Sequence, residues 1–244
     1  SLWVSTSNGL NRYIREKDCF DRFYYDELDS STISHDVVRY LYRDKNNNFW
    51  ITTRKGLNKL VVTTSGKFEF KRFFPEVTIP EKNQEKELSM FSMVDDSSGN
   101  IWTGSWGGGL IKFNPNSRKF KHYRHEPGNI QSISSNIVRY VTMDHKGLIW
   151  IGTYSEGINI FDPKTETFKN YRNTPSLAKL LLGETNILTI MHDSKRNTWI
   201  GGNGSLHVID PRQMDLLLSR SMTNGRESIG NNGIGRINHI YEDN

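Results

Sequence analysis

The stretch Ser134–Tyr171 reads SSNIVRYVTMDHKGLIWIGTYSEGINIFDPKTETFKNY and contains the signals of four short strands. Apolar residues alternate with polar ones up to Asp144, a turn-rich tetrad follows, and a second apolar run begins at Ile149. Gly157 predicts a tight hairpin, because glycine adopts a positive φ without a steric clash. A third strand then leads to the turn-forming pair Asp162-Pro163, and FKNY supplies the fourth. The stretch therefore predicts one four-stranded antiparallel sheet.

The same text recurs along the chain with a period near 49 residues. Five tryptophans open the second strands and stand 47, 52, 48 and 49 residues apart: Trp3, Trp50, Trp102, Trp150 and Trp199. An aspartate precedes each of the last four by six residues: Asp44, Asp96, Asp144 and Asp193. Sheets of this kind bury their apolar faces by stacking around an axis, and we expect the recurrent Trp and Phe side chains to form the core between them. The sequence therefore predicts an all-β chain, a β-propeller built of four-stranded antiparallel blades.

We treat residues 1–244 as a single propeller domain or segment, divided into repeat units. The units span about residues 1–29, 30–79, 80–128, 129–178 and 179–229, with 230–244 as the first strand of a further or closing blade. Two arrangements remain open. The last strand can complete the first sheet and close a five-bladed ring, or the five units can be consecutive blades of a larger ring with edges that need covering.

Composition excludes several classes of protein. Hydrophobic residues make up 35% and charged residues 24% of the 244 residues, which is typical of a folded chain. The sequence contains no apolar run long enough for a membrane span. Cys19 is the sole cysteine and excludes an intramolecular disulfide. The net charge of +5 is spread along the chain without a basic stripe, which argues against a nucleic-acid partner.

The residues that carry chemistry in enzymes fall here into structural patterns. The repeated aspartates suit hairpin turns, in which a carboxylate accepts backbone N–H bonds, better than a pair of glycosidase acids. The seven histidines lack metal-ligand spacing, the serines lack a nucleophile-elbow context, and the glycine clusters lack the lysine of a phosphate loop. We therefore predict no catalytic residue, no metal site, no cofactor and no enzymatic activity in this segment.

Candidate ligand-binding residues lie at the loop ends of the blades and in the first strands. Trp106 and Tyr154 occupy equivalent hairpin positions, and their rings can stack on sugar rings. Arg54 lies in the corresponding loop of the second unit. The first strands contribute guanidinium groups able to make bidentate bonds to carboxylate or sulfate. These candidates are Arg39, Tyr40, Arg139, Tyr140 and Arg236.

The combined pattern of an SxxxVxxIxxD strand, WIGT, a glycine hairpin, [DN]P and FxxY resembles the two-component regulator propeller repeat. Its best copies are Ser134–Tyr171 and the block from Ser89 to Tyr123. The resemblance implies the periplasmic sensor region of a Bacteroidetes-type hybrid two-component protein, the ectodomain of an inner-membrane protein. The resemblance implies that such a parent protein regulates transcription by a phosphorelay. The sensor histidine kinase and the response regulator of that phosphorelay lie outside this chain. Family rings usually have seven blades.

The resemblance also implies partners. These are an oligosaccharide ligand, a second copy of the parent protein in a homodimer, and a neighbouring propeller or immunoglobulin-like domain. It implies neither nucleic-acid binding nor membrane insertion for this segment. Two rival functions remain open: a protein-interaction and dimerisation propeller without a small-molecule ligand, and a propeller-fold carbohydrate-active enzyme.

Overall fold

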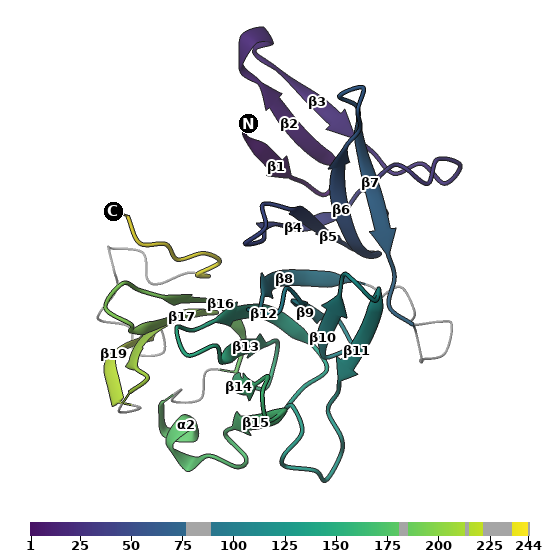
Figure 1. Ribbon diagram of the computed structural model, residues 1–244. Helices are drawn as coiled ribbons and strands as arrows, with labels where there is room; N and C mark the ends of the chain where they lie inside the picture. Colours follow the sequence, from purple (N-terminus) through teal and green to yellow (C-terminus); the bar gives the residue numbers. More distant parts are fainter. Residues whose placement is uncertain (77–88, 181–184, 213–214, 222–235, 244) are drawn as a thin grey trace. The chain divides into compact units, whose positions relative to one another are not determined.

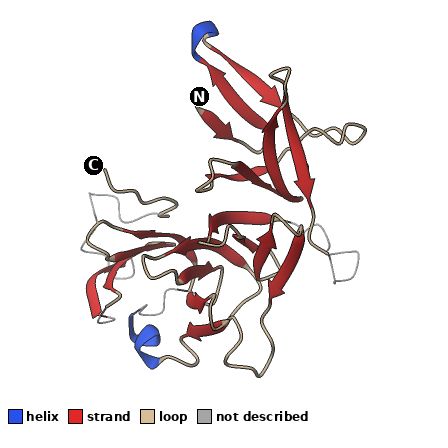
Figure 2. Ribbon diagram, in the orientation of Figure 1, coloured by secondary structure: helices blue, strands red, loops and turns tan. Residues whose placement is uncertain are grey.

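The computed structural model describes residues 1–76, 89–180, 185–212, 215–221 and 236–243. The chain forms two compact bodies: the N-terminal body, Ser1–His122, and the C-terminal body, Tyr123–Asn244. Both consist almost entirely of strands (Figure 2). The prediction of an all-β chain built from antiparallel sheets is confirmed.

The N-terminal body contains the first three sheets (Figure 1). The first has three strands, β1 (Trp3–Ser5), β2 (Leu10–Ile14) and β3 (Cys19–Phe23), with the 3-10 helix η1 (Arg15–Lys17) between the last two. The second sheet comprises β4 (Val38–Arg43), β5 (Phe49–Thr53), β6 (Gly56–Val62) and β7 (Phe68–Phe73). The third comprises β8 (Met90–Asp95), β9 (Ile101–Ser105), β10 (Leu110–Asn114) and β11 (Lys119–Tyr123), whose last residue belongs to the C-terminal body.

The C-terminal body contains two further four-stranded sheets. The fourth sheet comprises β12 (Val138–Met143), β13 (Ile149–Thr153), β14 (Ile158–Asp162) and β15 (Thr167–Asn170), followed by α2 (Pro175–Leu180). The fifth comprises β16 (Ile187–His192), β17 (Thr198–Gly202), β18 (Ser205–Asp210) and β19 (Asp215–Ser221). In all five sheets the strands pair in chain order, as the repeat pattern predicts.

Each repeated aspartate binds its hairpin and the following tryptophan at once. In the second sheet, the Asp44 carboxylate accepts the backbone N–H groups of Asn46 and Asn48 at 2.9 and 2.8 Å, and the Trp50 indole N–H at 2.8 Å. The predicted role in the turn is confirmed, and the indole bond adds to it. Trp50 is 1% exposed, so its N–H would otherwise be buried without an acceptor.

The same carboxylate–indole bond occurs in three more sheets. Asp96, Asp144 and Asp193 accept the indole N–H of Trp102, Trp150 and Trp199 at 2.8, 3.1 and 2.8 Å. Burial alone would raise the pKa of Asp96, but the bonds from Asn100, Trp102 and the hairpin amides hold that pKa below its ordinary value. The carboxylate is therefore kept ionised beside the core.

The tryptophans pack between neighbouring sheets of the same body. In the N-terminal body, Trp50 lies in a cluster with Met90, Met93 and Phe113 from the third sheet, and its ring centroid is 6.0 Å from that of Phe113. In the C-terminal body, Trp150 lies in a cluster with Ile187 and other apolar residues of the fifth sheet. The predicted inter-sheet core of aromatic side chains is confirmed within each body.

A glycine sets the approach between sheets of the C-terminal body. A Cβ on Gly152 would lie 2.6 Å from Cγ2 of Ile187, the first residue of the next sheet. A Cβ on Gly201 would lie 2.6 Å from Cγ2 of Ile237 in the same way, and the backbone N–H of Ile237 donates to the carbonyl of Gly202 at 3.2 Å. The segment after Arg236 therefore lies against the fifth sheet.

That placement bears on ring closure. Among the described residues the first sheet keeps three strands, with β1 paired to β2 alone. It lacks the fourth strand that a closed five-bladed ring would supply to it. The observed sheets are those of a partial propeller.

His192 occupies the interface between the fourth and fifth sheets. Its ring lies 5.7 Å from that of Trp150 in a T-shaped arrangement, and its Nδ1 contacts Thr198 Oγ1 at 3.0 Å. Burial lowers the pKa of His192 to about 4. The charges of Asp144 and Asp193 raise this pKa and that of His145 lowers it, but burial dominates. The imidazole is therefore neutral at pH 7.

Replacing Asp96 with alanine should lower the free energy of unfolding by about 1–3 kcal/mol, because the buried Trp102 indole and the hairpin amides lose their acceptor. Urea unfolding followed by tryptophan fluorescence measures the change. The matched control is Asp162→Ala, whose carboxylate accepts an exposed hydrogen bond from the Lys164 amide. Equal losses in the two variants would contradict the role of the carboxylate–indole bond.

Stability should also fall as the pH is lowered from 6.5 to about 4, partly through His192. In this window the unfolded chain binds the proton and the buried imidazole does not, so protonation favours unfolding by up to about 3 kcal/mol. His192→Gln should flatten this part of the stability profile, whereas His239→Gln, which alters an exposed histidine, should not. An unchanged slope in His192→Gln would show that the imidazole titrates alike in both states.

Candidate functional site

The predicted hairpin residues project from one repeated backbone position. Each stands four residues after its tryptophan. Its backbone N–H donates to the carbonyl of the residue directly before the first strand of its own sheet. Arg54 donates to Val37 at 2.9 Å, Trp106 to Ser89 at 3.0 Å, and Tyr154 to Ile137 at 3.0 Å. The backbone is the same in all three sheets, so the side chain alone distinguishes them.

A second repeated position lies beside the first. It directly follows the first residue of each first strand, and its occupants in the second to fifth sheets are Arg39, Phe91, Arg139 and Leu188. The sequence pattern indicated the two arginines but not Phe91. The shared strand register, which places Phe91 after Met90 as Arg39 follows Val38, could have identified it.

In the N-terminal body these positions form a group that we call the Arg39 patch: Arg39, Arg54, Phe91 and Trp106. The Arg39 Cζ lies 5.4 Å from the centroid of Phe91, and the Phe91 and Trp106 rings are 6.1 Å apart. Burial, and then the nearby charge of Arg54, lower the pKa of Arg39. Two cations therefore lie beside two aromatic rings, an arrangement able to stack on a ring and bind an anion.

In the C-terminal body the same positions bring Arg139 and Tyr154 together. The Arg139 Cζ lies 5.6 Å from the Tyr154 ring centroid, and the tyrosine is 41% exposed. The predicted residues of the two bodies thus form two separate groups, each with an arginine on an aromatic ring.

The other predicted site residues lie elsewhere. Tyr40 and Tyr140 are partly buried and pack against the apolar clusters around Trp50 and Trp150. Arg236 is exposed, and its backbone forms an isolated β-bridge with Asn203. It directly precedes Ile237, which is the counterpart of Ile187 and Val38. It therefore does not share the position of Arg39 and Arg139, which each follow such a residue.

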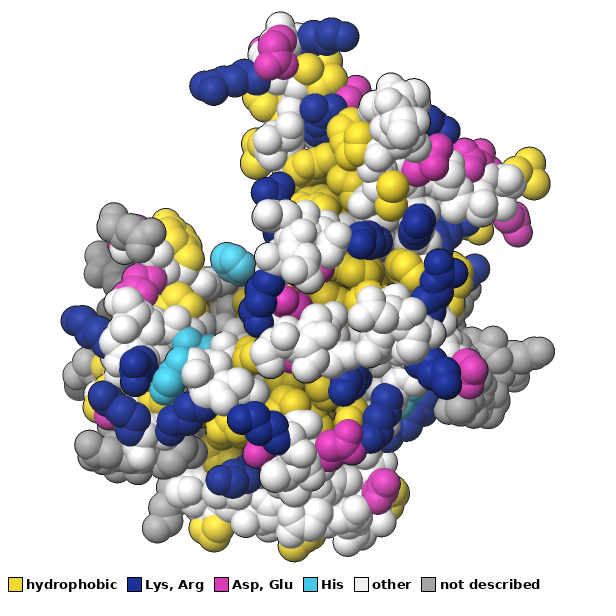
Figure 3. All heavy atoms as spheres, viewed as in Figure 1, with side chains coloured by type: hydrophobic (Ala, Val, Ile, Leu, Met, Phe, Trp, Pro, Cys, Tyr) yellow, Lys and Arg dark blue, Asp and Glu magenta, His cyan; other side chains and the backbone are white. Residues whose placement is uncertain are grey.

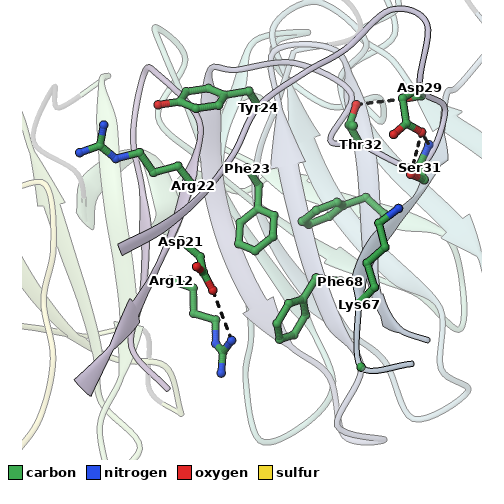
Figure 4. A pocket seen from close by; sticks show the side chains of 12 residues that line it. Arg12, Asp21, Arg22, Phe23, Tyr24, Asp29, Ser31, Thr32, Lys67 and Phe68 are labelled. Carbon is green, nitrogen blue, oxygen red and sulfur yellow. Dashed lines mark hydrogen bonds and ion pairs between the residues drawn. The ribbon is translucent and has the colours of Figure 1, made fainter. Parts of the chain in front are cut away.

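A pocket that the sequence did not indicate lies between the first and second sheets of the N-terminal body, with a volume of about 600 Å³ (Figure 4). The rings of Phe23 and Phe68 lie in its middle. Arg12 and Asp21 lie to one side of them, and Asp29 with Ser31 to the other. Phe68 distinguishes it from the repeat pattern, because it stands two residues before the repeated Phe70, where the fourth sheet has Glu166.

Charges on the visible face are dispersed: Lys and Arg side chains alternate with acidic and apolar ones in Figure 3. In the described ranges, no group of three or more His, Cys, Asp or Glu residues is placed to hold a metal ion. Within the same ranges, no helix has both the length and the apolar character needed to cross a bilayer.

Solved structures share the fold along nearly the whole chain. The extracellular domain of BT3049 from B. thetaiotaomicron, described as a hybrid two component system, matches with a TM-score of 0.71 and 23% identity over 99% of this chain. That of BT4673 from the same organism matches with a TM-score of 0.65 and 19% identity over 90% of this chain. The chain spans 29% of the length of each of these two domains.

An enzyme shares the fold as well. Virginiamycin B lyase from Staphylococcus aureus matches with a TM-score of 0.59 and 11% identity over 91% of this chain and 67% of its own. No curated protein matches the sequence. Two segments, residues 32–55 and 132–155, match the family described as two component regulator propeller. Residues 32–55 and 132–155 are therefore two-component regulator propeller repeats, and the chain that carries them has a β-propeller fold.

Proposed function

We propose that this chain is part of the extracytoplasmic sensor region of a hybrid two-component signalling protein, that it lies in the periplasm, and that it binds an oligosaccharide. The observation that carries the proposal is the presence of two regulator propeller repeats in a fold shared with extracellular domains of two such systems. Signal output then belongs to a kinase outside this chain, and the segment acts by binding without catalysis.

The Arg39 patch and the Arg139–Tyr154 pair are the surfaces that we assign to the ligand. The exposed ring of Tyr154 offers a flat face on which the C–H face of a sugar ring can stack. The guanidinium of Arg139 lies within 5.6 Å of that ring and can bind a hydroxyl or acidic group at the edge of the same sugar. The repeated backbone holds these side chains in place, so little ordering is needed on binding.

Signalling requires that the ligand favour one arrangement of the parent protein over another. A ligand shifts such an equilibrium only by the difference between its affinities for the two arrangements. In the proposed protein, that difference arises where the loop ends of the propeller meet a second copy of the parent, a neighbouring propeller or an immunoglobulin-like domain.

Titration calorimetry of the 244-residue chain against neutral and acidic oligosaccharides tests the binding step. Saturable binding that weakens about tenfold or more in Trp106→Ala or Arg139→Ala is expected, because each substitution removes a stacking or charged group from its surface. Tyr171→Ala is the matched control, since Tyr171 is 40% exposed and hydrogen bonds to Glu156 outside both groups.

The outcomes discriminate among the rival functions. Absence of binding across the panel, in a folded protein that self-associates, would favour a protein-interaction propeller. Release of a shorter saccharide during the titration, detected by mass spectrometry, would favour a carbohydrate-active enzyme. Binding that is equally strong in all variants would place the ligand away from the Arg39 patch and the Arg139–Tyr154 pair.

A further inference from the structure

The pocket between the first and second sheets contains a guanidinium that is fixed in place but donates no hydrogen bond to the described part of the chain. The Arg12 Cζ lies 4.7 Å from the Phe68 ring centroid, and its side chain is 28% exposed. Arg12 forms an ion pair with Asp21, whose Oδ2 lies 3.6 Å from Nη1, beyond hydrogen-bond distance. The donors of Arg12 are thus oriented and available.

Two other arginines of this chain, Arg72 and Arg212, donate hydrogen bonds to acceptors of the protein itself. Arg72 donates to the backbone carbonyls of Thr32, Asp26 and Asp29 at 2.7 to 3.0 Å, and so secures the loop beside the pocket. Arg212 donates two hydrogen bonds to the Asp210 carboxylate, at 2.8 and 2.7 Å. Arg12 differs from these two arginines, because no described acceptor takes hydrogen bonds from its two parallel N–H groups. A carboxylate matches the geometry of such a pair of donors.

The position of Arg12 differs from that of its counterparts in the neighbouring sheets. In each of the first three sheets a cation stands opposite the tryptophan of its own sheet. Lys59 and Lys112 lie over those tryptophans, with Nζ 5.5 and 5.2 Å from the ring centroids of Trp50 and Trp102. Arg12 lies instead over Phe68, a residue of the next sheet, and so faces the pocket.

The equivalent place in the C-terminal body carries different chemistry. Phe68 stands two residues before Phe70, and Glu166 stands two residues before Phe168 at the matching register. The Glu166 carboxylate there accepts the hydroxyl of Tyr123 at 2.8 Å. An acid of the protein itself therefore occupies the position that an aromatic ring holds beside Arg12.

The far side of the pocket offers an acceptor. Asp29 Oδ1 accepts the backbone N–H and the hydroxyl of Ser31 at 2.8 and 2.7 Å. The same Ser31 bonds, with smaller effects from Lys67 and Arg72, lower the pKa of Asp29, so its carboxylate stays ionised. Its second oxygen, Oδ2, takes no hydrogen bond from a described residue and can accept one from a ligand hydroxyl.

We propose that this pocket binds a sugar acid, a six-membered ring that bears a carboxylate and hydroxyl groups. Arg12 binds the carboxylate through two N–H donors, the Phe23 and Phe68 rings contact the C–H face of the sugar, and Asp29 accepts a hydroxyl. The cavity of about 600 Å³ lies in the size range of small-molecule sites. The site is separate from the Arg39 patch, so the inference does not depend on the proposed function.

Ligand-detected NMR and calorimetry on the 244-residue chain test the proposal with three probes. Glucuronate carries ring, carboxylate and hydroxyls, benzoate lacks the hydroxyls, and glucose lacks the carboxylate. Saturable binding of glucuronate with a dissociation constant of about 1 mM is expected. Benzoate should bind more weakly and glucose more weakly still. Equal binding of glucose and glucuronate would overturn the assignment to Arg12, and tighter binding of benzoate would overturn the role of Asp29.

Substitutions locate the site. Arg12→Lys keeps the charge but loses the paired donors and should weaken glucuronate binding about tenfold. Phe68→Glu introduces the acid that the fourth sheet has at the equivalent position, and it should abolish glucuronate binding. Lys112→Ala, which removes the counterpart cation away from the pocket, should leave it unchanged. Near-ultraviolet circular dichroism verifies that each variant is folded. Failure of glucuronate to saturate, or full binding in a folded Phe68→Glu variant, would refute the proposal.

Discussion

A single carboxylate in each of four sheets joins the local turn to the packing of the whole sheet. Asp96, for example, accepts two hairpin amides and the indole N–H of Trp102, which is fully buried. A buried indole needs an acceptor, and a hairpin needs a group that mimics the next peptide. Because one carboxylate meets both needs, Oδ1 accepting the hairpin amides and Oδ2 the indole, the turn cannot change its geometry without releasing the tryptophan. The spacing of six residues is thereby required of every copy, whatever the surrounding side chains are.

A scaffold that is fixed in this way leaves a few positions free to vary. The residue four places after each tryptophan has the same backbone hydrogen bond in three sheets, yet it is arginine, tryptophan or tyrosine. The residue beside it varies in parallel. The two positions hold two cations in the second sheet, two aromatic rings in the third, and a cation beside an aromatic ring in the fourth. Within such a fold, a binding surface can be composed from side chains presented at regular intervals, without any change in the sheets that carry them.

The sequence was sufficient for the strands and turns of the repeat and insufficient for the side-chain contacts that join separate strands and sheets. The tryptophan period and the paired turns predicted the strands, their order and the inter-sheet aromatic core. The indole bond was missed because it joins two strands across a hairpin, a contact that spacing alone does not reveal. The pocket at Arg12 was missed for a different reason: the guanidinium lies over Phe68 of another sheet, 56 positions later in the sequence. Arg236 was grouped with Arg39 on text similarity, whereas the strand register places it before the equivalent residue.

The bare Cα of Gly152 and Gly201 has a consequence for how such a chain can lengthen. The fourth and fifth sheets each receive the next segment through a contact between a bare Cα on one side and a branched apolar residue, Ile187 or Ile237, on the other. An interface of this kind is generic, since it does not depend on complementary charges or shapes particular to one pair of units. Whole repeats can therefore be duplicated, removed or exchanged during evolution while every junction remains compatible, and the number of repeats is free to differ between proteins built on the same unit.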